Sequence, residues 1–283
     1  MSRLLICTDL DRTLIPNGLL PESAGAMSKF RKLLEHPEVT LVYVTGRHME
    51  LVEEAIVQFG LPLPGFVIAD VGSSIYEPDD SGWHYLDSWE EKIKPDWGGK
   101  TANELLLLTG DIKGLTLQEP AKQGPHKLSF YLDLNVAVEP LLAELSGRYE
   151  AQGISSNLVW SIDDDKQKGL LDILPASAGK SQSIEFLMAQ LDILPGQVVF
   201  AGDSGNDLEV LSSHIPSVLV ANASDELREQ AREMAKSAGH EDKLYLARGG
   251  FHGMNGNYSA GILEGVIHFI PAMDKWIEES NEG

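Results

Sequence analysis

The sequence contains a single cysteine and lacks any uninterrupted apolar run of about 18 residues, the length that a membrane-spanning helix needs. Cys7 cannot form a disulfide within the chain, and it lies in an apolar stretch typical of a buried strand. The first residues carry aspartates where a signal peptide requires an apolar segment. We therefore expect a protein of the reducing cytoplasm that has no membrane partner.

Basic residues are also scarce, since 22 Lys and Arg stand against 43 Asp and Glu and give a formal net charge of −21. Nucleic acids and anionic membranes are bound by clustered basic side chains, so no nucleic acid is expected as a partner. The same charge disfavours long-range attraction of a phosphorylated substrate. Such a substrate would need a local device, such as a metal ion with backbone amides; otherwise the acidity serves solubility or adaptation to a salty cytosol.

Short apolar, β-branched runs alternate with longer segments of helical period. The candidate strands are 4–8, 41–45, 66–69, 198–201 and 218–220. The candidate helices are 22–36, 47–59, 181–192, 205–213, 223–237 and 258–269. This rhythm predicts an α/β fold whose core is a doubly wound parallel, Rossmann-like sheet covered by helices on both faces.

The rhythm changes between residues 80 and 172, where alternating polar and apolar residues predict antiparallel strands and a helix. These elements are expected at 127–132, 158–161 and 135–150. We predict a core domain of residues 1–79 and 173–283 with an inserted α+β cap domain of residues 80–172. The polar segments 77–82 and 163–169 would be the hinges.

Asp9 and Asp11 are separated by one residue and directly follow the first apolar run. Doubly wound sheets bind their ligands at the carboxyl ends of their strands, so both carboxylates would lie where chemistry is done. Alone, this D-x-D pattern is weak, because aspartates at such positions are often turn formers or helix caps.

Two further motifs predict a site for an anion. Thr45 and Gly46 follow an apolar strand and open a helix, and Lys180 stands with Gly179 at another helix start. A helix N-terminus offers unpaired N–H groups and a positive dipole to a phosphate, which would also explain a lysine there. The structural alternatives are an ordinary helix cap at Thr45 or Gly46 and a solvated Lys180.

The most specific motif is GDSGND at residues 202–207, between an apolar strand and a helix. Asp203, Asn206 and Asp207 offer oxygen ligands in one tight turn, which suits magnesium. The alternative is a plain turn. The four motifs occur in order, each at a strand end or a helix start, and we predict that they converge on one crevice.

In that order DLDRT, VTGR, the Lys180 segment and GDSGND resemble the motifs of the haloacid dehalogenase superfamily, over essentially the whole chain. The insertion resembles a type IIB cap. Within the superfamily the sequence is similar to the sucrose-phosphate phosphatases. The segments that carry this similarity are QGPHKLSFY at 123–131, LDILP at 171–175, VANA at 220–223, GILE at 261–264 and HF at 268–269.

The resemblance implies that Asp9 is a nucleophile that forms an aspartyl-phosphate, and that Asp11 protonates the leaving sugar oxygen and then activates water. It implies the cofactor Mg2+, bound by the Asp9 side chain, the Asp11 main-chain carbonyl and Asp203, with Asp207 acting through water. It further implies phosphate contacts from Thr45, Gly46, Lys180 and Asn206.

The cap should close over the core and contact the sugar. The candidates stand in or near the resembling segment and are Gln123, His126, Lys127, Ser129 and Ser161. Structural roles remain open for them, because a lone His is often structural and Lys127 could face solvent. Trp83, Trp89 and Trp97 could stack on a sugar, but packing in the core of a small cap is the preferred interpretation.

The leading hypothesis is hydrolysis of sucrose 6-phosphate to sucrose and phosphate. Many sucrose-phosphate phosphatases carry Glu where Ser74 stands, and some relatives that act on mannosylfructose phosphate lack it too. A mannosylfructose-phosphate phosphatase, a broader sugar phosphatase and a phosphomutase therefore stay open. From another class, a non-catalytic sugar-phosphate-binding or synthase-interacting module is the alternative. A sucrose-phosphate synthase as a physical partner is likewise left open.

Overall fold

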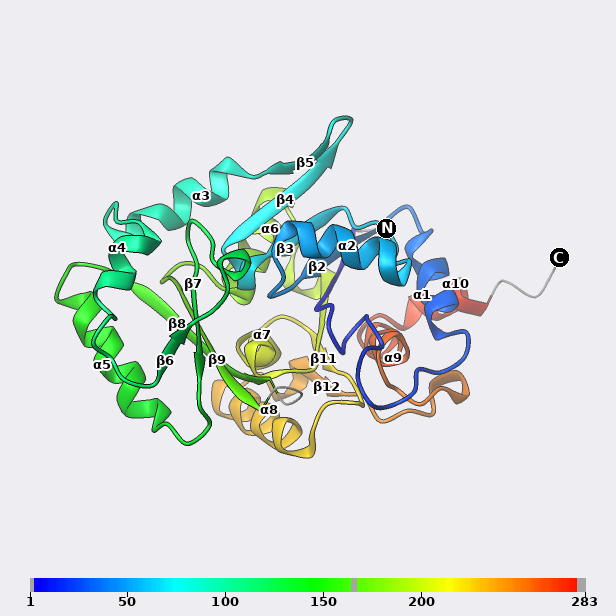
Figure 1. The fold of residues 1–283 in the computed structure, drawn as a ribbon. Helices are drawn as coiled ribbons and strands as arrows, with labels where there is room; N and C mark the ends of the chain where they lie inside the picture. The colour runs from blue at the N-terminus through cyan, green and yellow to red at the C-terminus, as the bar shows by residue number, and fades with distance from the viewer. Residues whose placement is uncertain (1–2, 164–166, 279–283) are drawn as a thin grey trace.

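The computed structural model describes residues 3–163 and 167–278. Within them the larger sheet has eight strands in the order β12-β11-β10-β1-β2-β3-β4-β5 (Figure 1). The strands are β1 (Leu4–Thr8), β2 (Val39–Val44), β3 (Phe66–Ala69), β4 (Ser74–Asp79), β5 (Gly82–Tyr85), β10 (Val198–Gly202), β11 (Ser217–Leu219) and β12 (Leu244–Leu246). The pairs from β12 to β3 are parallel, whereas β4 and β5 add antiparallel. The predicted α/β core with a parallel sheet is confirmed.

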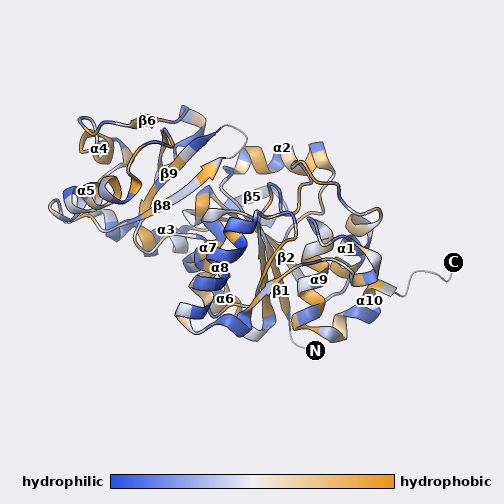
Figure 2. Cartoon of the chain, turned by 90° about the horizontal axis from the view of Figure 1, so that it is seen from below, coloured by the Kyte–Doolittle hydropathy of each residue, from blue (hydrophilic) through white to orange (hydrophobic). Residues whose placement is uncertain are grey.

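Helices cover both faces of this sheet because its central strands are apolar on both sides. In β1, Leu4 and Ile6 pack into one cluster with α1, α2, α9 and α10, while Leu5 and Cys7 pack into a second with α3, α6, α7 and α8. The helices are α1 (Ala26–Leu34), α2 (Met49–Phe59), α3 (Asp87–Ile93), α6 (Lys180–Leu191), α7 (Leu208–Leu211), α8 (Asp225–Ala238), α9 (Ser259–Phe269) and α10 (Asp274–Glu278). Figure 2 shows the sheet between these layers, with α8 largely hydrophilic.

A second, antiparallel sheet lies beside the first and has the order β6-β7-β9-β8 within the described residues (Figure 1). Its strands are β6 (Leu115–Leu117), β7 (Leu128–Leu132), β8 (Ser156–Asp163) and β9 (Lys168–Pro175), and its helices are α4 (Ala102–Leu107) and α5 (Val138–Glu150). Trp97 lies in the core of this smaller unit. Trp89 is buried against Phe186, with ring centroids 4.9 Å apart. Trp97 thus packs in the core of the smaller unit, as predicted, whereas Trp89 packs in the core of the larger unit, which differs from the prediction.

Several local predictions differ from the structure. The segment at 77–82 is the turn of the β4–β5 hairpin, and Asp79 Oδ1 accepts a hydrogen bond of 2.6 Å from Ser81 N. β5 therefore belongs to the larger sheet, although it falls in the range predicted for the cap. The helix expected at 205–213 begins as a 3-10 turn and is α-helical only in α7. β12 has three half-buried residues, too few to give a strand pattern.

The division into a core and a cap of residues 80–172 stays a prediction. Part of the second hinge, 163–169, lies outside the described residues, and β9 begins at Lys168. Among the residues that the structure describes, no helix is long and apolar enough to cross a membrane.

The strand order places a topological switch point between β1 and β10, because β2 and β3 follow on one side and β11 and β12 on the other. In open α/β sheets such a point leaves a crevice at the carboxyl ends of the strands. Asp9 directly follows β1, Thr45 follows β2 and Asp203 follows β10. The fold thus brings residues that are far apart in the sequence to one edge of the sheet.

Candidate active site

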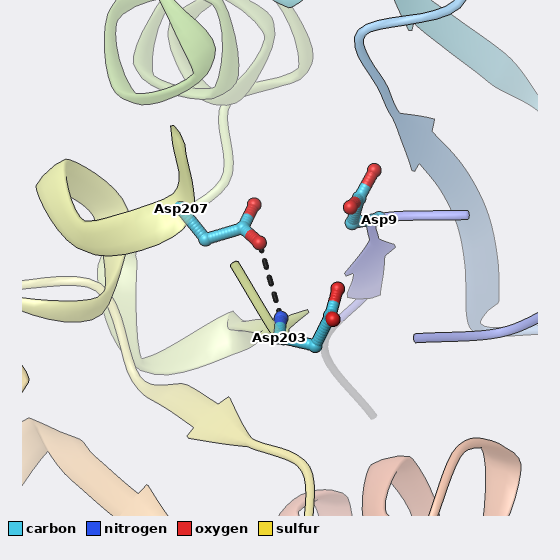
Figure 3. Close-up of side chains that lie close together, drawn as sticks. All are labelled: Asp9, Asp203 and Asp207. Carbon is cyan, nitrogen blue, oxygen red and sulfur yellow. Dashed lines mark hydrogen bonds between the residues drawn. The ribbon is translucent and has the colours of Figure 1, made fainter. Parts of the chain in front are cut away.

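Three buried carboxylates meet at the switch point (Figure 3). Asp9, Asp203 and Asp207 each offer an oxygen within 4.8 Å of the others, and the three residues are at most 5% exposed. Asp203 Oδ2 accepts no hydrogen bond from the described residues. Such a concentration of buried negative charge is stable only when cations neutralise it. The donor set is all oxygen, which fits a hard divalent ion such as Mg2+.

Lys180 supplies one positive charge to this cluster from the first position of α6. Its Nζ lies 2.7 Å from Asp207 Oδ1, 2.8 Å from Asn206 Oδ1 and 3.4 Å from Asp9 Oδ1. Burial would lower the pKa of Lys180, but the attraction of Asp207 and Asp9 outweighs it and raises the pKa. The lysine is therefore a fixed cation facing the cluster, as the sequence predicts for an anion site.

Asp9 and Asp203 both have a raised pKa. Burial, followed by the repulsion of Asp207, Asp203 and Asp11, raises the pKa of Asp9, against the opposing effect of Lys180. Burial and Asp207 raise the pKa of Asp203 to about 7. Arg12 Nε also lies 3.3 Å from Asp203 Oδ2, so Lys180 and Arg12 supply two positive charges against three carboxylates, and a divalent cation would supply the missing positive charge.

Asp207 has both oxygens engaged by protein donors. Oδ1 accepts from Lys180, while Oδ2 accepts from the backbone N of Asp203 at 3.1 Å and of Ser204 at 3.0 Å (Figure 3). Gly202 makes this possible, because a Cβ there would lie 2.5 Å from Asp207 Cγ. These contacts are consistent with a carboxylate that orients the turn and reaches a cation through water.

Asp11, the second aspartate of the D-x-D motif, is paired with Arg47. Arg47 donates from Nε to Asp11 Oδ2 and from Nη2 to Oδ1, both at 2.7 Å, and Asn17 Nδ2 donates to Oδ1 at 2.8 Å. Burial alone would raise the pKa of Asp11, but the Arg47 guanidinium lowers it. The two aspartates of the D-x-D motif therefore sit in opposite electrostatic environments, which lets one fold assign them different roles.

Thr45 and Gly46 form the loop that follows β2. Thr45 N donates to Ile68 O at 2.8 Å, which continues the sheet pairing, and the Thr45 hydroxyl oxygen accepts from Arg47 N at 3.2 Å. Both residues border a cavity of about 510 Å³. The prediction that Thr45 and Gly46 lie beside Asp9 and Asn206 in one crevice agrees with this geometry.

The cavity is large enough for a small-molecule ligand and lies between the carboxyl edge of the larger sheet and the smaller unit. Its walls come from both parts of the chain. From the larger sheet and its loops come Asp9, Asp11, Arg12, Asn17, Thr45, Gly46, Arg47, His48, Leu51, Val71, Asp203, Ser204 and Asn206. From the smaller unit come Gln118, Lys122, Lys127, Ser161, Ile162, Leu170 and Asp172.

Of the five predicted sugar contacts, Lys127 and Ser161 are among the described residues that line the cavity. Gln123, His126 and Ser129 are not, and this placement does not favour direct contact. The Gln123 side-chain amide instead accepts a hydrogen bond from Ser129 N at 2.8 Å and donates one to Ser129 O at 3.0 Å. His126 lies beside Trp97, with ring centroids 5.8 Å apart. Ser129 donates to the cavity-lining carboxylate of Asp172.

The sequence motifs did not single out Arg47, Asn17, Gln118, Lys122 or Asp172. Arg47 is the last residue of VTGR and Asn17 lies four positions after DLDRT, so a wider interpretation of these two motifs could have included them. The other three lie on or between short strands of the smaller unit. Their orientation depends on strand pairing, which no local pattern reveals.

Comparison with known proteins gives one family match over most of the chain. A family model described as sucrose-6F-phosphate phosphohydrolase matches residues 2–270. A protein of Nitrosococcus oceani that carries only the general name HAD-like hydrolase, for haloacid dehalogenase-like, is 46% identical over 280 residues, which are 99% of this chain and 75% of that protein. Sucrose-phosphatase 1 of Nicotiana tabacum is 32% identical over 280 residues, and the match spans 95% of this chain but 59% of the tobacco protein.

A solved structure of the sucrose-phosphatase from Synechocystis, in complex with sucrose and phosphate, superposes with a TM-score of 0.77 at 26% identity. The match covers 95% of this chain and 99% of that one. The arrangement of both sheets is thus shared with an enzyme crystallised with the two halves of a sugar phosphate.

Proposed function

The chain belongs to the sucrose-6F-phosphate phosphohydrolase family, and from this premise we propose that it hydrolyses a disaccharide phosphate, with sucrose 6-phosphate as the leading candidate. It has the haloacid dehalogenase fold and is a phosphoric monoester hydrolase that acts on sugar phosphates. One observation carries the proposal. Lys180 and the carboxylate of Asp9 meet at 3.4 Å beside a cavity that the smaller unit closes with polar side chains.

In the proposed reaction, the Asp9 carboxylate attacks phosphorus and forms an aspartyl-phosphate while the bond from phosphorus to the sugar oxygen breaks. Asp11 gives its proton to the leaving sugar oxygen and later takes one from the water that hydrolyses the intermediate. The contrast between Asp9, placed among carboxylates, and Asp11, placed against Arg47, supports this division. Because Arg47 favours the ionised form of Asp11, substrate binding must loosen that pair before Asp11 can act as an acid.

The phosphoryl group would be held by the Thr45 hydroxyl, the Gly46 amide, Lys180 and Asn206. Mg2+ would bind to Asp9, the Asp11 carbonyl and Asp203, with Asp207 reached through water. When bound, the ion neutralises charge on the phosphoryl oxygens. The protein's own contribution is to hold Asp9 and Lys180 against the phosphoryl group and to exclude bulk water from the cavity.

The sugar would lie against four of the five described polar residues that the smaller unit contributes to the cavity, namely Gln118, Lys122, Ser161 and Asp172, while the fifth, Lys127, lies beside Gly46. Amide, ammonium, hydroxyl and carboxylate groups can each pair with sugar hydroxyls. Ser74, where many family members carry Glu, is buried at the start of β4 and is not among the described residues lining the cavity. The proposal assigns recognition of the disaccharide to the smaller unit.

A phosphate-release assay with and without Mg2+ tests the proposal. The substrates are sucrose 6-phosphate, mannosylfructose phosphate, trehalose phosphate and hexose monophosphates. We expect Mg2+-dependent release that is fastest with sucrose 6-phosphate and lost in Asp9→Asn. Asp133→Asn, which alters an exposed carboxylate paired with Lys168, is the matched control.

Each alternative predicts a distinct outcome in this assay. Preference for mannosylfructose phosphate, or equal rates on all esters, would replace sucrose 6-phosphate as the substrate. A phosphomutase would release no net phosphate, and a binding module would bind without turnover. Unchanged release by Asp9→Asn would refute the proposed nucleophile. The cytoplasmic location and the synthase partner stay predictions.

A further inference from the structure

A buried ion pair joins the two parts of the chain at the cavity. Lys127, which precedes β7 of the smaller sheet, places its Nζ 3.0 Å from Oδ1 of Asp70, which follows β3 of the larger sheet. The two residues are 3% and 6% exposed. Charges buried to this degree are costly unless they stay paired. The pair therefore ties the position of the smaller unit to the segment that begins at Asp70.

That segment is a short turn with an unusual backbone. Asp70, Val71 and Gly72 all have positive φ angles, of 52°, 59° and 95°. A β-branched residue such as Val71 rarely adopts this conformation, so the surroundings must hold it. Asp70 N donates to Arg47 O at 2.9 Å, and Val71 N donates to Thr45 O at 3.0 Å. The turn thus fixes the backbone on both sides of Gly46.

The same turn also packs against the start of α6. A Cβ on Gly72 would lie 2.2 Å from the carbonyl carbon of Gly179, the residue that precedes Lys180. From the other side, Trp89 Nε1 donates to Gly72 O at 3.1 Å. The turn at 70–72 therefore touches both proposed phosphate-binding segments, the Thr45–Gly46 loop and the start of α6.

The Lys127 ammonium lies at the phosphate end of the cavity. Besides Asp70, it lies 3.4 Å from Gly46 O, on the loop whose amide is the proposed phosphate ligand. Asp70 Oδ1 has no hydrogen-bond partner among the described residues, so the pair is held by charge and not by an aligned hydrogen bond. The ammonium can therefore turn toward an anion in the cavity without leaving Asp70.

We propose that Asp70 is a positioning residue that holds the Lys127 ammonium beside Gly46. The smaller unit thereby contributes a positive charge to the phosphoryl end of the substrate. The position of the smaller unit is thereby also coupled to the phosphate-binding loop. This rests on the proposed function. It assigns Lys127 to the phosphate half of the substrate, although its position in the sequence suggested a sugar contact.

The two reaction products separate these assignments, because inorganic phosphate and free sugar each represent one half of the substrate. Inhibition constants for phosphate and for sucrose are measured with Mg2+ for wild type, Asp70→Asn, Lys127→Met and the double variant. Lys127→Arg keeps the charge. Asp133→Asn with Lys168→Met removes an exposed ion pair of the smaller unit as the matched control.

Removal of either partner is expected to raise the inhibition constant for phosphate on the order of tenfold, in line with the loss of one member of a buried charge pair. The constant for sucrose should change less than about twofold. The double variant should lose no more than the worse single variant, because the two residues act as one unit. Lys127→Arg should restore much of the phosphate affinity, and the control should match wild type.

An increase in the inhibition constant for sucrose, with the constant for phosphate unchanged, would make Lys127 a sugar ligand and overturn the proposal. Additive losses in the double variant would show that Asp70 does not act through Lys127 and would also overturn it. Thermal unfolding identifies variants that fail to fold. The double variant leaves neither charge unpaired. If a single variant is unstable, the inhibition constants of the double variant still show whether the pair serves phosphate or sucrose binding.

Failure of the proposed function would be recognised separately. If wild type hydrolyses para-nitrophenyl phosphate but no sugar phosphate, the proposed substrate is wrong, and the phosphate constants still test the pair. If wild type has no turnover at all, calorimetric titration with inorganic phosphate and with sucrose gives the same comparison from binding alone.

Discussion

Arg47 binds both carboxylate oxygens of Asp11, with Nε to Oδ2 and Nη2 to Oδ1 each at 2.7 Å. The geometry is the bidentate one in which an arginine and a carboxylate fix each other's orientation. Asp11 is thereby aimed and kept ionised in the absence of substrate. Arg47 therefore controls when the proposed acid becomes available, and it does so from the VTGR motif, 36 positions along the chain.

Arg47→Met should lower kcat for the sugar phosphate about 10²-fold, the lower range of general acid–base catalysis, because Asn17 is then the remaining side-chain partner of Asp11 among the described residues. The same variant should slow para-nitrophenyl phosphate much less, since that leaving group needs no proton. Steady-state kinetics on both esters checks the prediction, with Asp11→Asn as the reference for full loss of the acid. Equal losses on both esters would place the effect of Arg47 in a step that the two esters share, namely phosphate binding or hydrolysis of the aspartyl-phosphate, and would contradict the prediction.

Asp203→Asn should abolish the response to Mg2+. At 100 times its dissociation constant, a bound ion stabilises the folded state by about 2.7 kcal/mol. For a chain of this size, that raises Tm by roughly 5–10 °C. The wild type should show this rise and the variant none, while its metal-free Tm should not fall, because one of three mutually repelling buried carboxylates has been neutralised. Differential scanning fluorimetry with Mg2+ and with a chelator measures both effects. An undiminished Mg2+ response in the variant would remove Asp203 from the ion site.

Gly202→Ala should displace Asp207, because the new methyl group would lie 2.5 Å from Asp207 Cγ. Overpacking of this kind costs about 1–3 kcal/mol of unfolding free energy, and here it should also cost activity, since Asp207 holds Lys180. Gly196→Ala is the control, because a Cβ there meets no atom within 4 Å. Urea unfolding together with phosphate release measures the two losses, and the control should differ little from wild type in both.

The stability of the protein should rise with pH below about 6.5 through His126. Burial lowers the pKa of His126 below its ordinary value of 6.5, so the unfolded chain binds the proton more tightly than the folded one. Acid therefore favours unfolding in this window, and the contribution is complete above pH 6.5. His126→Gln should show a flatter rise of Tm between about pH 5 and pH 7, the range in which histidine side chains titrate. Parallel Tm profiles for the two proteins would show that His126 does not contribute.

The position of the site along the sheet could be predicted from short-range patterns. Asp9, Thr45 and Asp203 each directly follow an apolar run, and parallel strands of one sheet end at a common edge. The sequence motifs therefore predicted their convergence, and the start of α6 at Lys180 agrees with the expected helix. The predicted fold class holds for the same reason, since burial of both sheet faces leaves continuous apolar strands.

The contacts of the smaller unit could not be predicted in this way. Ser129 faces Asp172 because β7 and β9 pair in one particular register, and a shift by one residue would turn each side chain to the opposite face of the sheet. Gln123 and His126 stand in the segment that suggested sugar contacts, but they lie outside the set of described residues that line the cavity.

The amino-acid sequence by itself determined which chemistry the chain carries, because strand ends and helix starts are local features that place Asp9, Thr45, Lys180 and Asp203. Only the tertiary structure decided how that chemistry is controlled. The pairs Arg47 with Asp11 and Lys127 with Asp70 join segments 36 and 57 residues apart, and their side chains meet only because the sheet and its insertion pack in one arrangement. Side-chain direction across such distances depends on register and packing, which no short stretch of sequence encodes.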